Sequence, residues 1–181
     1  MNVLISAPDG SELSTSFPAY YQSYLKEYQG HDLLKDLMEQ SNTTQKFLFS
    51  VPAEKEKYRY ATGKWSLREV AGHVSDTERI LSYRALRIAR GDKTPLPGFD
   101  ENEYAFQSNY HSRPLKGIAE EMLTIRNASI SLFLNMNEDM FKQTGVSNNN
   151  PVSVKALLYC IIAHQVHHLN VISERYLASF N

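Results

Sequence analysis

The chain has 181 residues, 42% of them hydrophobic and 11% aromatic, which suits one full hydrophobic core and is too short for two ordinary domains. We therefore expect a single domain over residues 1–181. Nineteen basic residues against twenty acidic ones leave a formal net charge of −1. Since no overall positive field would attract phosphate backbones or anionic lipid, nucleic acid is not an expected partner.

Residues 1–17 lack the basic start and long apolar run of a secretory signal. No later stretch approaches the roughly 20 apolar residues that a membrane span needs. We expect a soluble, cytoplasmic protein with no membrane partner. The single cysteine, Cys160, cannot form an internal disulfide and lies in the apolar run 156–163, so a buried structural role is favoured over a catalytic thiol.

Helical periodicity, interrupted by proline, glycine and asparagine clusters, dominates the rest of the chain. After a frayed start at 1–17, a short aromatic-rich helix is predicted at 18–28. Gly30 separates it from a longer helix at 31–49, and residues 51–64 are predicted to form a loop. Strand signals are scarce.

The clearest helix start lies at Ser66-Leu67-Arg68-Glu69. This pattern fits a capping box, in which the serine hydroxyl and the glutamate carboxylate satisfy backbone N–H groups of the first turn reciprocally. The helix is predicted to run from Leu67 to about Arg90 and to end at Gly91.

A proline-bearing loop is predicted at 92–113, with a helical turn around 101–106. It is followed by a helix at 115–136, an asparagine-rich loop at 137–151, and a last helix at 153–177 that Ser153 could cap. Four long helices predict an all-α bundle. Long loops in compact domains often cover functional sites, which draws attention to the 92–113 segment.

The most informative stretch is His164-Gln165-Val166-His167-His168, because histidines four residues apart on a helix can bind one metal ion together. With about 100° per residue, His168 lies at about 40° from His164, on the edge of the apolar face. His167 lies at about 300°, off that face, and is the weaker candidate.

A third donor is expected from another helix, since catalytic zinc sites commonly use three protein ligands. His73 is the natural choice, because it follows the capped helix start and flanks an apolar stripe. The alternative is that these are structural histidines held by hydrogen bonds, since such pairs also arise by chance. The residues alone leave the two interpretations about equally supported.

Several motifs resemble the DinB/YfiT-like superfamily over nearly the whole chain from about Tyr24. They are Lys64-Trp65-Ser66, then Gly72-His73-Val74-Ser75-Asp76-Thr77-Glu78, then Arg84-Ala85-Leu86-Arg87, and finally the closing histidine cluster. The resemblance implies a four-helix bundle of up-down-down-up topology with a long crossover, here with a short extra N-terminal helix. It also implies a divalent metal held by three histidines, which fall on His73, His164 and His168.

The chain departs from the family after its last histidine. Leu169-Asn170-Val171 stands where the family often has a small residue and glutamine. This difference leaves the three expected ligands intact and puts any shared substrate contact at that point in doubt.

Other polar residues near the histidines are weaker candidates for metal binding or substrate contact. Asp76 and Glu78 lie at about 300° and 140° from His73, so at least one is expected in a salt bridge. Asp76 or His167 remains a possible fourth metal donor. Arg84, at about 20° from His73, and Tyr104 in the proline-bearing loop are weak candidates for substrate contacts.

Nearby aromatic residues have expected roles as well. Trp65 is expected to anchor the helix start by packing. Phe99 and Tyr104 could cap the metal cleft, with ordinary core packing at least as well supported.

The resemblance favours an enzyme, because relatives include thiol-dependent S-transferases and isomerases as well as candidate hydrolases. In such a site a water or thiol can bind the metal at an open coordination position, and the metal then lowers its pKa. We expect zinc or nickel, a small-molecule substrate and a low-molecular-weight thiol as cosubstrate. Two alternatives stay open: a non-catalytic or stress-associated metal-binding protein, and a metal-free helical scaffold.

Homodimers are common among relatives, so we expect this chain to form a homodimer. The aromatic segment around Tyr20, Tyr21 and Tyr24 could form a dimer contact or could pack on the bundle instead.

Overall fold

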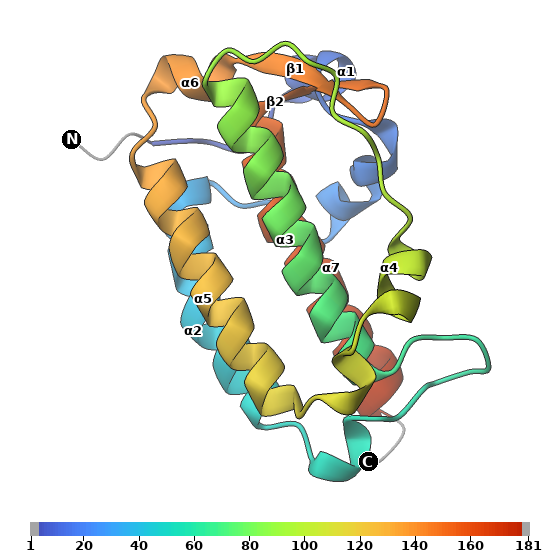
Figure 1. Cartoon of the computed structure of the whole chain (residues 1–181). Helices are drawn as coiled ribbons and strands as arrows, with labels where there is room; N and C mark the ends of the chain where they lie inside the picture. Colours follow the sequence, from blue (N-terminus) through green and yellow to red (C-terminus); the bar gives the residue numbers. More distant parts are fainter. Residues whose placement is uncertain (1–3, 179–181) are drawn as a thin grey trace.

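The computed structural model describes residues 4–178, without the side chains of Leu13, Ser14, Tyr20, Tyr21, Gln22 and Leu25. The dimer contact considered for Tyr20 and Tyr21 therefore falls outside the described side chains. Four long helices form the body of the molecule: α2 (Leu33–Phe49), α3 (Leu67–Ala89), α5 (Leu115–Leu134) and α7 (Val154–Val171). Helices α3 and α5 run in one direction and α2 and α7 in the other (Figure 1). The predicted up-down-down-up bundle is confirmed.

The predicted helix boundaries follow local hydrogen bonds. At the start of α3, the Ser66 backbone N–H donates to Glu69 Oε2 at 2.6 Å, and the Glu69 N–H donates back to Ser66 Oγ at 3.3 Å. Gly91 follows the end of α3 with φ of +81°, the left-handed conformation that glycine adopts without strain. At the start of α7, Ser153 Oγ accepts from the Ala156 N–H at 3.0 Å.

The connection between α3 and α5 is the long crossover. It runs back along the bundle and contains α4 (Glu101–Gln107) and the 3₁₀ turn η3 (Tyr110–Ser112) (Figure 1). The Leu96 N–H donates to the Val146 carbonyl, and the Asn148 N–H donates to the Leu96 carbonyl, both at 2.9 Å. These bonds fix the crossover before it passes over the bundle.

Two segments differ from the sequence-based expectation. Within the start predicted to be frayed, α1 (Gly10–Thr15) is a helix with a capping box from Asp9 and Glu12. The loop predicted at 137–151 contains α6 (Glu138–Lys142) and an antiparallel hairpin of β1 (Thr144–Ser147) and β2 (Asn150–Ser153). The hairpin turns at Asn148 and Asn149, whose φ angles of 50° and 60° suit asparagine.

The remaining short elements extend or connect the bundle. They are the 3₁₀ segments η1 (Ala19–Lys26) and η2 (Ala53–Lys55) and the π-helical segment η4 (Ile172–Leu177), which continues α7. The predicted aromatic-rich helix at 18–28 thus corresponds to η1. None of the helices between residues 4 and 178 is both long and apolar enough to cross a membrane.

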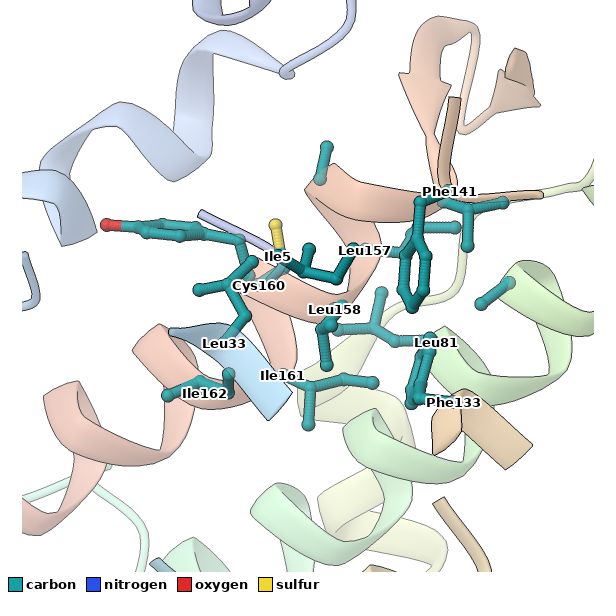
Figure 2. Packing of buried hydrophobic residues seen from close by; sticks show 14 of the residues in the cluster. Ile5, Leu33, Leu81, Phe133, Phe141, Leu157, Leu158, Cys160, Ile161 and Ile162 are labelled. Atoms are coloured by element: carbon teal, nitrogen blue, oxygen red, sulfur yellow. The ribbon is translucent and has the colours of Figure 1, made fainter. Parts of the chain in front are cut away.

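The hydrophobic core consists of two clusters at different levels of the bundle. The larger one surrounds the first half of α7 and the second half of α3, and Leu81, Phe133, Leu158 and Ile161 meet within it (Figure 2). Cys160 belongs to this cluster with 0% exposure, as expected, and burial raises the pKa of its thiol well above the usual value. Between the clusters lies a level of buried polar side chains, and the three candidate ligands lie there.

Candidate metal centre

Three histidine side chains converge between α3 and α7. His73 Nε2 lies 3.0 Å from His164 Nε2, and His168 Nε2 also lies 3.0 Å from His164 Nε2. One nitrogen of each ring falls within 4.8 Å of the others, and no further metal-binding group of this kind occurs in residues 4–178. The structure therefore brings together the three residues that the sequence singled out.

Helix geometry and packing position each ring. His164 and His168 are one turn apart on α7, with ring centroids 4.4 Å apart. His73 lies on α3 and faces both, at 4.9 Å. On its other side the Trp65 ring packs against it at 4.7 Å, so the tryptophan before the helix cap also orients a candidate ligand. The expectation that Trp65 packs at the helix start agrees with this contact.

The three imidazoles are held in their neutral form. Burial lowers the pKa of His73 to about 4. Burial, reinforced by the neighbouring histidines, lowers the pKa values of His164 and His168 well below the usual range. At neutral pH each ring therefore has one nitrogen lone pair free to bind a cation.

Hydrogen bonding within the cluster cannot satisfy all three rings. A neutral imidazole nitrogen carries either one proton or one lone pair, so His164 Nε2 forms one good hydrogen bond and not two. A metal ion accepts all three lone pairs, and ligand nitrogens around a tetrahedral zinc lie about 3.3 Å apart, close to the spacing here. The residues thus fit a divalent metal. His168 Nδ1 is buried without a hydrogen-bond partner.

Neither candidate for a fourth donor points into the cluster. His167 Nδ1 contacts Glu27 Oε1 at 2.7 Å, away from the other rings. Asp76 accepts a hydrogen bond from the Tyr110 hydroxyl at 2.8 Å and pairs with Arg79. Burial raises the pKa of Asp76 even with these partners. Among the described residues, three histidines are therefore the candidate ligands that converge here.

A network of buried polar side chains connects the four long helices next to the histidines. Arg126 on α5 forms two hydrogen bonds of 2.8 Å with Glu78 and also donates to Gln165, the residue after His164. Gln165 in turn donates to Thr44 on α2. Glu78 thus forms the interhelical salt bridge expected of one of the two carboxylates. The network joins all four long helices beside the histidines and fixes the register of α3 against α7.

Two cavities reach the histidines from different sides. The first, of about 130 Å³, has His73 and His164 in its wall, together with Tyr24, Thr77, Arg84, Gly98, Phe99, Glu101 and Asn148. The second, of about 280 Å³, has His168 and His167 in its wall, together with Tyr60, Gly63, Lys64, Trp65, Val70, Asn102, Val171 and Tyr176. A small molecule could therefore approach the centre.

Arg84 and Tyr104, the two weak candidates for substrate contacts, differ in their position relative to the cavities. Arg84 lines the first cavity and is buried, whereas Tyr104 is 48% exposed and packs against Phe99 in a tilted arrangement with ring centroids 5.0 Å apart. Phe99 itself is part of the cavity wall. Tyr104 does not line either histidine cavity in the described structure.

Sequence reasoning missed Thr77, Glu101 and Asn148 as cavity residues. Thr77 could have been found, because it lies four residues after His73 and so on the same helix face. Glu101 and Asn148 come from the crossover and the hairpin turn. Their positions depend on how those segments fold back.

Comparison with known proteins agrees with the geometry. The family model of the DinB superfamily matches residues 37–172. A relative from Oceanobacillus iheyensis, named as a candidate metal-dependent hydrolase, is 26% identical over 141 residues, which is 77% of this chain and 80% of the relative.

Two solved structures share the fold. YfiT from Bacillus subtilis, described as a probable metal-dependent hydrolase with an unusual four-helix bundle topology, matches with a TM-score of 0.71 and 16% identity, over 78% of this chain and 82% of YfiT. The mycothiol-dependent maleylpyruvate isomerase matches with a TM-score of 0.63 and 11% identity, over 81% of this chain and 60% of the isomerase. The chain belongs to the DinB superfamily.

Proposed function

We propose that this protein is a metal-dependent enzyme that catalyses either hydrolysis or the transfer of a low-molecular-weight thiol. The observation that carries the proposal is the convergence of three neutral imidazoles on the walls of two cavities, without a fourth described donor. A site with three protein ligands keeps a coordination position for substrate, whereas structural sites are closed by four.

Several residues of this chain would bind the metal or form the cavity next to it. His73, His164 and His168 would hold the ion, and a divalent ion bound there would lower the pKa of a water or thiol and polarise the substrate. Trp65 packs on His73 and limits its ring motion. Phe99 and Tyr24 contribute apolar ring surface to the wall of the first cavity.

The similar proteins support both reaction types. The Oceanobacillus protein is described as a candidate metal-dependent hydrolase and YfiT as a probable one, and the isomerase depends on mycothiol. We further propose zinc or nickel as the native ion, because all-imidazole sites suit both. The partners would be a small-molecule substrate and, for transfer, a thiol.

An activity screen tests the proposal. Protein purified without a metal-affinity tag is incubated with activated esters and amides, and separately with several thiols plus an electrophile, with and without chelator. We expect turnover that chelation abolishes and zinc or nickel restores, with His164→Ala inactive and His167→Ala active. Bound metal without turnover in any assay would favour a non-catalytic metal-binding protein instead.

A further inference from the structure

Arg84 on α3 is a buried arginine without a carboxylate partner. Its side chain is 4% exposed, and Nη2 donates to the Pro97 carbonyl at 2.6 Å. No carboxylate oxygen in the described part of the chain lies within 4.0 Å of it. Buried charges are normally paired, and a guanidinium has five N–H donors. Arg84 thus keeps donors available on the cavity side.

Arg126 shows how this protein treats a buried arginine elsewhere. The residue is 2% exposed, and Glu78 binds its guanidinium in a bidentate manner, with Leu37, Gln40 and Gln165 as further acceptors. The two arginines are buried to a similar degree, but Arg126 is saturated with acceptors, whereas Arg84 has one carbonyl and the face of the Phe99 ring. Arg84 thus lacks the carboxylate partner that Arg126 has, and an anion from outside the chain would supply it.

Thr77 supplies a second unsatisfied group in the same cavity. Its side chain is 4% exposed, and Oγ1 is buried without a hydrogen-bond partner. A buried hydroxyl without a partner is destabilising, so a ligand that accepts its hydrogen bond would gain affinity. Thr77 and Arg84 both line the cavity whose wall includes His73 and His164.

These groups form one stripe along α3. At about 100° per residue, Thr77 and Arg84 lie at about 40° and 20° from His73. The helix rise separates the Cα atoms of His73 and Arg84 by about 16 Å, and long helical side chains lean toward the N-terminus, which brings the guanidinium toward the histidines. The cavity therefore has imidazoles at one end and a cation at the other.

We propose that this cavity binds a substrate with a carboxylate group, which pairs with Arg84 and accepts a hydrogen bond from Thr77. The substrate's reacting group then lies at the histidines. The placement of the reacting group rests on the proposed function, whereas the binding of a carboxylate at Arg84 and Thr77 does not. A planar carboxylate matches the guanidinium fork. A monoanion is favoured over a phosphate dianion because Glu101 adds a negative charge to the cavity wall.

Binding of simple probes tests the proposal without relying on turnover. Butyrate, butyramide and inorganic phosphate are titrated calorimetrically into the full-length protein, both as purified and after chelation. In the titration of the chelated protein, the probe cannot coordinate a metal ion, so any binding comes from the protein's own groups. We expect butyrate to bind in both arms, with butyramide and phosphate at least tenfold weaker. Equal binding of butyramide, or preferential binding of phosphate, would overturn the assignment.

Variants locate the binding residue. Arg84→Met keeps the apolar stem and should weaken butyrate binding at least tenfold, while Arg84→Lys should restore part of it. The matched control is Arg87→Met on the same helix, whose guanidinium pairs with Asp92 and does not line the cavity. If Arg84→Met fails to fold, Thr77→Val provides the test, since it removes only the hydroxyl.

The outcomes separate the two proposals. Unchanged butyrate binding in the variant that folds would refute the carboxylate site even if the protein is an active metalloenzyme. Arginine-dependent binding in a protein without turnover would support the site while the proposed reaction fails. Glu101→Gln should tighten butyrate binding, because it removes a like charge from the cavity wall.

Discussion

His73 and His164 place their Nε2 atoms 3.0 Å apart although 91 residues separate them in the chain. The contact joins α3 to α7 across the bundle, with His168 one turn further on α7. His164 is buried, and His73 and His168 are partly buried. Because this burial keeps all three rings neutral, the cluster presents nitrogen lone pairs to a cation and carries no mutually repelling positive charges.

Adjacent histidines on α7 provide a matched pair of variants. His168→Ala should weaken zinc binding by more than about a hundredfold, because losing a residue that supports a ligand already costs 10- to 100-fold. His167→Ala should change zinc affinity little, since His167 pairs with Glu27. Competition titrations with a chromogenic chelator measure both. Equal losses in the two variants would contradict the ligand set.

The pH dependence of the metal-free protein follows from the buried histidines. His73 titrates near pH 6.5 when unfolded and its pKa falls to about 4 in the folded chain, so the unfolded state binds more protons in between. The free energy of unfolding should therefore be unaffected by this group above pH 6.5 and should fall as pH decreases toward 4. The loss from His73 is on the order of 3 kcal/mol.

Urea unfolding of the chelated protein across this pH range measures the effect. In His73→Gln the decline between pH 6.5 and 4 should be shallower, because one buried base is removed. An identical decline in the two proteins would show that other groups control acid stability.

The buried pair of Arg126 and Glu78 should contribute strongly to stability when only one partner is removed. Arg126→Met leaves Glu78 buried without its partner and should cost about 3–5 kcal/mol. The double variant Arg126→Met with Glu78→Leu should be less destabilised than the single variant, since no charge is then left unpaired. Denaturant midpoints for the single and double variants test this, and an additive loss would contradict it.

Two glycines in helices should respond oppositely to alanine. A Cβ at Gly72 would lie 2.2 Å from the Tyr110 ring, so Gly72→Ala should force this ring away from Asp76 and cost about 1–3 kcal/mol. Gly117 on α5 has no atom within 4 Å of the corresponding position, so Gly117→Ala should stabilise by up to about 1 kcal/mol. Thermal unfolding compares the two variants with the parent protein.

Local patterns predicted the parts of the structure that depend on nearby residues. The Ser66 and Glu69 capping box, the stop at Gly91, and the preference for His168 over His167 all follow from helix geometry. Similar signals existed for two elements that were missed. Asp9 with Glu12 is a capping box for α1, and Asn148-Asn149 suits a tight hairpin turn.

The site's surroundings could not be predicted in this way, because they depend on chain segments that are far apart. The burial of Arg84 depends on the crossover, whose Pro97 carbonyl and Phe99 ring cover it. The orientation of His167 depends on Glu27, 140 residues earlier in the chain. Neither contact has a local signature. The histidine triad was identifiable because two of its members share one helix. The capped helix start before His73, together with the resemblance, indicated the third member.

Metal content is the most direct test of the histidine centre. Protein purified without a metal-affinity tag, then dialysed against trace zinc or nickel, is analysed by mass spectrometry for metal per chain, beside His73→Ala prepared in the same way. The three converging imidazoles predict about one divalent ion per chain in the parent protein and a large loss in the folded variant. A parent protein that stays metal-free, or a His73→Ala variant that retains the same metal content, would contradict the account.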